Sequence, residues 1–122
     1  MLKPEVLRGD KDFNAVYKKG KSVGDRYVVI FYKRNGLDYN RIAFLASKKV
    51  GNAVTRNRAR RLMKESVRTT DPIDKEGYDI IFIARKTIVG AGQSEVNRSI
   101  SSALRRTDLR EKNKERSKDT KK

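Results

Sequence analysis

The segment from Lys48 to Lys64 constrains the fold more than any other part of the chain. It contains seven Lys or Arg residues and no acid. Apolar runs with the composition of β-strands flank it, one at 41–47 and one at 78–86. A helix that connects two strands in this way commonly joins parallel neighbours. The sequence therefore predicts a βαβ crossover whose helix is strongly basic.

The predicted basic helix has two distinct faces. It should begin after a turn and cap at Gly51 and Asn52, and it should end before Asp71-Pro72. Glu65, its one acid, is expected near Arg58 and Arg61, and the basic face is expected to have no partners within the helix. At roughly 100° per residue, one face carries Ala59, Leu62, Met63 and Ser66, and the other carries Arg56, Asn57, Arg60, Arg61, Lys64 and Arg68.

The choice of cation on this helix favours a phosphate-bearing partner. Arg outnumbers Lys five to one between residues 56 and 68. A guanidinium group can bind two phosphate oxygens at once, whereas Lys would serve solubility equally well. Asn57 adds a group that both donates and accepts, which suits a sugar, a base edge or a hydrated metal ion. The alternative is a helix face that is simply solvated.

Composition narrows the possible functions. The net charge of +16 favours nucleic acid as the partner, and an anionic membrane surface less so. The chain has no Cys and no His, which excludes disulfides, Cys/His zinc sites and His-dependent nucleophiles. At 122 residues it should form one domain. The longest apolar run, 27–32, is too short to cross a bilayer, and the first residues resemble no signal peptide, so we expect a cytoplasmic location.

The first quarter of the chain predicts a short helix followed by a strand. Asp10 or Asp12 should cap the helix, which should run to about Lys19 and end at Gly20. Its apolar side chains have helical spacing, so they either pack on a sheet or, if the sheet beneath is open, stack on unpaired bases. These side chains are Phe13, Val16 and Tyr17.

The next residues predict two strands joined by a hairpin. Residues 21–34 are expected to form one strand, with Tyr27, Val29 and Phe31 on one face and the alternating residues on the other. A hairpin loop at 35–38 should lead to an antiparallel strand at 41–47.

The C-terminal half predicts a buried strand and a last helix. The run 78–86 is the most hydrophobic and should be buried on both faces. A helix opening at Ser94-Glu95 should place Val96, Ile100, Ala103 and Leu104 on the core. We expect a domain over residues 1–107 and a basic, disordered tail over 108–122.

Three blocks of sequence resemble the bacterial ribonuclease P protein component. The central block is Ser-Lys-Lys-x-Gly-Asn-Ala-Val followed by Arg-Asn-Arg, at 47–58. The upstream block begins Phe13-x-x-x-Tyr17 and continues to Val23, and the downstream block is Asp79-Ile80-Ile81-x-Ile83-Ala84-Arg85. Together they extend the resemblance over roughly residues 8 to 105.

The resemblance implies an α+β fold of the two-layer α/β sandwich type, with elements in the order αβββαβα. This order contains one strand more than the sequence pattern alone predicts, because that pattern does not indicate a separate short strand at residues 21–23. It also implies that the basic helix lies in a left-handed βαβ crossover, against the general right-handed preference.

The resemblance also implies a function. Members of this family are accessory subunits, expected at 1:1 with the RNA, of a ribonucleoprotein that removes the 5′ leader from precursor tRNA, and its catalytic centre is RNA with Mg²⁺. Contacts to the catalytic RNA would come from Lys48, Lys49, Asn52, Arg56, Asn57, Arg58, Arg60, Arg61 and Lys64, with Arg68 on the same basic face. A central cleft lined by Phe13, Tyr17 and Phe31 would hold the single-stranded leader.

Two departures from the family pattern and two other functions bear on this expectation. Lys64 stands where Arg is more common, and Phe31 stands where Tyr is common. A general RNA-binding module would share the basic helix but would not distinguish precursor from mature tRNA. A protein nuclease would need metal ligands, for which the candidates are Asp10, Asp12, Asp79 and Glu65.

Overall fold

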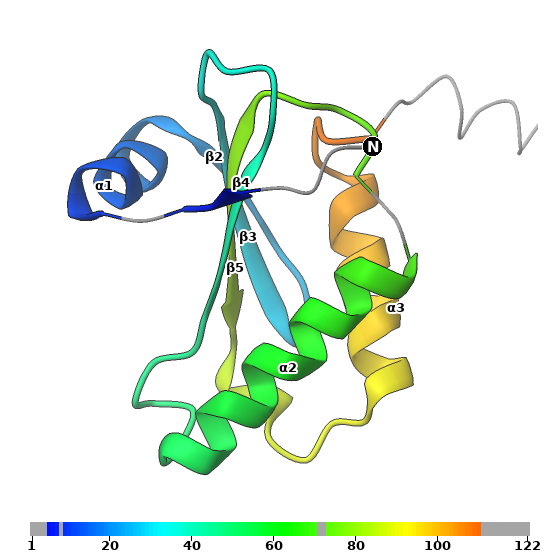
Figure 1. Cartoon of the computed structure of the whole chain (residues 1–122). Helices are drawn as coiled ribbons and strands as arrows, with labels where there is room; N and C mark the ends of the chain where they lie inside the picture. Colours follow the sequence, from blue (N-terminus) through cyan, green and yellow to red (C-terminus); the bar gives the residue numbers. More distant parts are fainter. Residues whose placement is uncertain (1–4, 8, 71–72, 111–122) are drawn as a thin grey trace, which may run out of the picture.

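The protein is built on one mixed sheet with helices on both faces. The computed structural model describes residues 5–7, 9–70 and 73–110. The sheet has five strands in the order β1-β4-β5-β3-β2. Figure 1 shows α2 and α3 side by side on one face of the sheet and α1 on the other. The helix α1 therefore adds a partial third layer to the expected two-layer sandwich.

The elements follow the predicted order αβββαβα once a two-residue strand at the N-terminal end is set aside. Among the residues that the structure describes, no helix is long and apolar enough to span a membrane. The elements are β1 (Glu5–Val6), α1 (Asp10–Lys19), β2 (Lys21–Gly24), β3 (Val28–Arg34), β4 (Arg41–Leu45), α2 (Ala53–Thr70), β5 (Tyr78–Ala84), the 3-10 helix η1 (Lys86–Ile88) and α3 (Gln93–Arg105).

The expected single strand over 21–34 is wrong, since the segment forms the antiparallel pair β2 and β3. The chain turns at Asp25, whose amide donates to the Val28 carbonyl at 2.8 Å. The Asp25 carboxylate also accepts from the Arg26 amide at 2.8 Å. An Asp that satisfies nearby backbone donors favours a turn over a continuous strand. The extra short strand implied by the family resemblance is thus present.

The expected hairpin between β3 and β4 is also wrong. β4 runs opposite to β3, as predicted, but β5 lies between them and pairs with both. β5 is the most apolar strand, and nearly all of its residues are buried. A central position buries both of its faces and pairs both of its edges. The parallel pairing of β4 with β5 across α2 confirms the predicted βαβ unit.

The predicted ends of α1 and α2 are confirmed at two positions and wrong at one. Asn52 caps α2 as predicted, its Oδ1 accepting from the Thr55 amide at 2.9 Å. α1 ends at Gly20 as predicted. The expected cap by Asp10 or Asp12 is wrong: Gly9 holds the capping position at φ 91°, and both acids lie in the first turn of the helix. A positive φ favours Gly over Asp at that position.

Two hydrophobic cores lie on opposite faces of the sheet. The alternation predicted for β3 holds within the strand: Val28, Ile30 and Tyr32 are buried in the larger core under α2 and α3, and Phe31 faces α1. Tyr27 is the exception, because it precedes β3 and is buried in the larger core. The core side chains predicted for the last helix are confirmed as Val96, Ile100, Ala103 and Leu104.

The packed domain continues past the expected boundary at residue 107. Leu109 is fully buried in the larger core, and its carbonyl accepts from the amides of Asp74 and Lys75 at 3.0 and 3.2 Å. The sequence does not predict this burial, because one apolar residue in a polar segment carries no periodicity. Residues 111–122, most of the expected tail, lie outside the described residues.

Candidate nucleic-acid interface

The helix α2 sorts its side chains as its periodicity predicts. Ala59, Leu62, Met63 and Ser66 are all buried against the sheet and α3. Because that stripe fills one side of the helix, the cations lie on the remaining arc. On this arc Asn57, Arg58, Arg61, Lys64 and Arg68 are exposed, while Arg56 and Arg60 are half-buried at its edge.

The expectation that the basic face has no partners within the helix is wrong for part of the arc. Arg68 donates to both Glu65 carboxylate oxygens, at 3.0 and 2.6 Å, so Glu65 pairs with Arg68 and not with Arg58 or Arg61. The hydrogen bond from Arg68 lowers the pKa of Glu65. Arg60 donates to the Asn57 side chain, which orients both groups. Exposed pairs of this kind contribute little stability. They do not involve Arg61 and Lys64, which are exposed at the centre of the arc.

The loop before α2 extends the basic surface. Lys48 and Lys49 are exposed in the turn between β4 and the helix. They lie close in sequence to the helix N-terminus, where the backbone dipole adds positive potential. The side-chain Oδ1 of Asn52 is used by the cap, so its side-chain N–H groups are the part of this amide that can donate to a partner.

Arg58 lies on the flank of the helix that faces the segment after β5. Its Nη2 donates to the Ala91 carbonyl at 2.8 Å. This bond ties α2 to the loop between η1 and α3. Arg58 therefore has one donor committed to the fold and its other donors available.

A shallow groove of about 510 Å³ runs between the basic arc and the start of α3. Gln93, at the first position of α3, donates to the Leu62 carbonyl at 2.9 Å and forms the side of the groove. Gln93 is not among the predicted site residues, and only its position at the start of α3 could have suggested it. The groove is lined by Arg58, Arg61, Leu62, Lys64, Glu65, Arg68 and Gln93.

The three predicted aromatic residues come together on the opposite face of the sheet. The rings of Phe13 and Tyr17 are stacked with centroids 6.4 Å apart, and Tyr17 meets Phe31 edge-on at 5.1 Å. Phe13 and Phe31 pack against the smaller core, whereas Tyr17 is 38% exposed. Burial raises the pKa of the Tyr17 hydroxyl. This aromatic cluster both packs on the sheet and presents ring surface to solvent.

The sheet beside the aromatic cluster is only partly covered. Val29, Leu45 and Ile83 are half-buried on the same face, and Val29 pairs with Ile83 across β3 and β5. The ten-residue α1 is too short to cover them. The open part of this face is therefore aliphatic at one end and aromatic at the other.

Three of the four acids considered as metal ligands are paired with arginines. Arg41 donates to both oxygens of Asp79, at 2.8 and 2.7 Å, and also to Asp12 at 3.4 Å. Asp10 lies in the first turn of α1, and Glu65 pairs with Arg68 on the other side of the sheet. Within the described ranges, no three acidic side chains are grouped so that they could hold a metal ion.

Comparison with known proteins gives one family. The ribonuclease P family model matches residues 1–108. The chain is 47% identical over 104 residues to the "Ribonuclease P protein component" of Clostridioides difficile, covering 84% of this chain and 91% of that protein. It is 44% identical to the corresponding protein of Alkaliphilus oremlandii over 103 residues, which are 84% and 90% of the two chains.

Solved structures agree with this result. The Staphylococcus aureus RNase P protein superimposes with a TM-score of 0.78 at 31% identity, covering 89% of this chain and all of that one. The Thermotoga maritima RNase P protein gives a TM-score of 0.75 at 32% identity, covering 85% of this chain and 98% of that one.

Proposed function

The chain belongs to the bacterial ribonuclease P protein family and is thus a subunit of a ribonucleoprotein endoribonuclease. From this we propose that it binds two RNA partners, one on each face of its sheet. The basic arc of α2 and the preceding loop bind the catalytic RNA. The aromatic cluster on the other face binds the single-stranded 5′ leader of precursor tRNA. The protein thereby increases the affinity of the complex for its substrate.

The observation that carries the proposal is the basic arc itself. The helix positions five exposed or half-buried guanidinium groups around one arc, and one of them, Arg68, is neutralised by an acid within the helix. A cationic surface that is not compensated internally gains stability when it neutralises phosphates and releases counterions. Arg61 and Lys64, which are exposed at its centre, are the strongest candidates for direct contact.

The leader assignment is supported by the aromatic cluster and its surroundings. Stacking on aromatic rings is sequence-tolerant and is worth about 1–3 kcal/mol per base. It therefore suits a leader whose sequence varies among precursors. Tyr17 offers the most exposed ring, and the half-buried Val29 and Ile83 extend the apolar surface along the sheet.

In this proposal the RNA performs the chemistry and holds most of the Mg²⁺, as the family resemblance implies. Three of the four acids that a protein nuclease could use are paired with arginines, since Asp12 and Asp79 bind Arg41 and Glu65 binds Arg68. The protein contributes binding and orientation. A 1:1 ratio with the RNA and a cytoplasmic location complete the proposal.

The decisive experiment is cleavage of precursor tRNA by the RNA subunit with and without this protein, at moderate Mg²⁺. We expect the protein to increase turnover and to strengthen binding of precursor relative to mature tRNA, and we expect the protein alone to cleave nothing. Equal affinities for precursor and mature tRNA in the assembled complex would instead support a general RNA-binding role. Cleavage by the protein alone would contradict the accessory role.

A further inference from the structure

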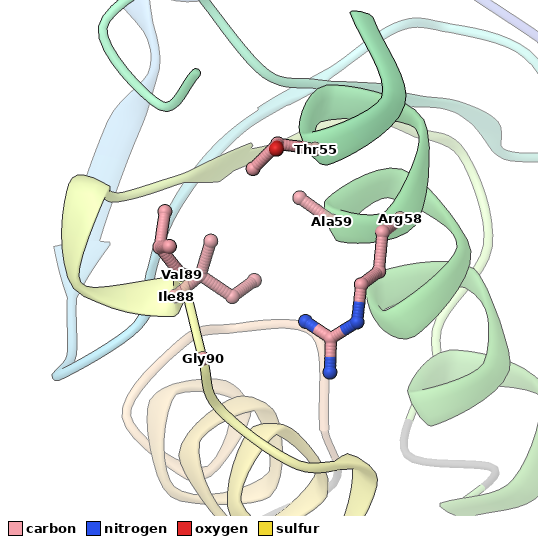
Figure 2. Close-up of a pocket in the computed structure, with 6 residues that line it drawn as sticks. All are labelled: Thr55, Arg58, Ala59, Ile88, Val89 and Gly90. Atoms are coloured by element: carbon pink, nitrogen blue, oxygen red, sulfur yellow. The ribbon is translucent and has the colours of Figure 1, made fainter. Parts of the chain in front are cut away.

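A small pocket opens between α2 and the segment that follows η1. It has a volume of about 240 Å³. Figure 2 shows Ile88 and Val89 facing Thr55 and Ala59 across the gap, with the guanidinium of Arg58 at its edge. Gly90 completes the lining. The pocket is smaller than those that hold drug-sized ligands, so it suits a single ring system or side chain.

The walls of the pocket are fixed by hydrogen bonds on both sides. Arg58 binds the Ala91 carbonyl at 2.8 Å, so it holds the loop against the helix. Within the loop, the Ile88 amide donates to Arg85 and the Ala91 amide donates to Ile88, at 2.9 and 3.0 Å. A pocket whose walls are already held in place costs little to order when a ligand enters.

The floor and rim of the pocket are aliphatic, its polar groups are the Thr55 hydroxyl and the Arg58 guanidinium, and its mouth is accessible. Ile88 and Ala59 form a buried floor, and Val89 at the rim is 52% exposed. Large apolar side chains with this exposure are few in the described part of the chain, and Val54, at the start of α2, is another. Exposed apolar surface beside a binding site commonly contacts a partner.

The surroundings of the pocket are cationic. Arg58 lies on its edge and Arg61 follows one turn later on α2, while Lys86 is exposed at the start of η1. An apolar pocket within a cationic surface matches a ligand that is polyanionic along its chain and apolar in its side groups. Among biological polymers this describes a nucleic acid whose base is unpaired.

We infer that this pocket receives one unpaired base of the catalytic RNA, with the adjoining phosphates on Arg58, Arg61 and Lys86. The inference rests on the proposed function of α2 and adds a base-binding site to it. The base comes from the catalytic RNA, since the pocket lies on the α2 side of the sheet, whereas the aromatic cluster assigned to the leader lies on the α1 side (Figure 1).

The test measures affinity for the catalytic RNA between 50 and 200 mM salt. Val89→Ser removes apolar surface from the pocket without changing charge. It should weaken binding about fivefold at every salt concentration and leave the slope of log affinity against log salt unchanged. Ala59→Leu fills the pocket from the helix side and should give a similar loss with the same slope.

Two control variants separate this loss from other effects. Leu37→Ser changes an exposed apolar residue that lies outside both the pocket and the basic surface, so this variant should bind like the wild type. Arg61→Gln removes a phosphate contact, so it should weaken binding and reduce the slope by about 0.7–0.9. If Arg61→Gln has no effect, the proposed function of α2 fails, whatever Val89→Ser does.

Three results would overturn the base-binding pocket. The first is wild-type affinity of Val89→Ser for the catalytic RNA. The second is a loss confined to precursor tRNA binding by the assembled complex, which would assign the base to the substrate. The third is a wild-type protein that sediments as a dimer without RNA while the Val89→Ser variant sediments as a monomer. That result would make the pocket a contact between two copies of this chain.

Discussion

The two faces of the sheet are covered to very different extents. α2 and α3, of 18 and 13 residues, close one face over a core that includes Met63, Phe82 and Leu104. The ten-residue α1 covers the other face, where Leu7, Val16, Ala43 and Ile81 are buried. Apart from the small pocket beside η1, the closed face presents the outer side of its helices, which is charged. The partly open face presents the sheet itself, which is apolar and aromatic.

This difference implies two kinds of binding in one small domain. Contacts to the outside of α2 are ionic, so their strength should fall steeply with salt. Contacts to the aromatic cluster depend on stacking, which salt affects far less. With on the order of five phosphate contacts, affinity for the catalytic RNA should fall about 10²–10³-fold between 50 and 200 mM salt.

The largest effect should follow from removing charge on the closed face. Replacing Arg56, Arg60 and Arg61 together by Gln should weaken binding to the catalytic RNA by about 4 kcal/mol, roughly a thousandfold, since each charged hydrogen bond is worth about 1.5 kcal/mol. Filter binding at several salt concentrations measures the loss and the expected shallower slope. Arg68→Gln is the matched control and should lose less than Arg61→Gln, because Glu65 already pairs with Arg68. Unchanged RNA affinity of the triple variant would remove the basis of the proposed interface.

The next effect concerns the link between the sheet and the helix of the open face. Arg41 bridges Asp79 in the sheet and Asp12 in α1, and the Asp79 side chain is only 9% exposed. Asp79→Ala should lower the free energy of unfolding by about 3 kcal/mol, because it leaves a poorly solvated guanidinium without its main partner. Asp12→Ala should cost less than about 1 kcal/mol, since Asp12 is more exposed and its contact is long. Urea unfolding tests both, and equal losses would show that α1 depends on Arg41 as strongly as the sheet does.

The sequence predicts the local elements of both faces well and their pairing only in part, since the parallel β4–β5 pair was predicted and the place of β5 next to β3 was not. Periodicity identified the buried stripe of α2, since each of its four residues is buried. The position of β5 between β3 and β4 depends on which strand gains most from central burial, and that is a comparison among distant segments. The short loop at residues 35–40, between β3 and β4, suggested a hairpin and gave no indication that β5 lies between these two strands.

The candidate site shows the same limit. The Arg-Asn-Arg block and the spacing of Phe13 and Tyr17 were sufficient to select the basic arc and the aromatic cluster. The partners of those residues were not predictable, because they come from elsewhere in the chain or from the choice of rotamer. Arg58 bonds to Ala91, 33 residues away, and Glu65 selects Arg68 over two other arginines within reach.

A smaller effect is expected on the open face. Phe13→Ala should reduce the preference of the assembled complex for precursor over mature tRNA about tenfold, as stacking on one base is worth about 1–3 kcal/mol. Its affinity for the catalytic RNA should remain near that of the wild type. Leu37→Ala is the control, an exposed apolar residue outside both sites. If Phe13→Ala instead weakened assembly with the catalytic RNA, and Arg60→Ala weakened only leader preference, the two faces would have to exchange roles.

The smallest effect concerns how α3 is held on the closed face. Asp25, in the turn between β2 and β3, accepts hydrogen bonds from Ser99 and Arg106 at 2.8 and 2.5 Å. Burial alone would raise the pKa of Asp25, but hydrogen bonds from the Arg26 amide, Ser99 and Ser102, together with the charge of Arg106, lower it overall.

Because the pKa of Asp25 is lower in the folded than in the unfolded protein, its ionisation stabilises the fold above the ordinary Asp pKa of about 3.9, and this stabilisation is lost as the pH falls through the folded value. The free-energy difference between wild type and Asp25→Asn, measured by urea unfolding, should therefore be constant from pH 7 to 5 and should narrow below about pH 4. A difference that stayed constant down to pH 2.5 would mean that the Asp25 contacts do not depend on its charge. In that case the charge of Asp25 would contribute nothing to holding α3, and the contrast between a charged closed face and an aromatic open face would apply only to the outside of α2.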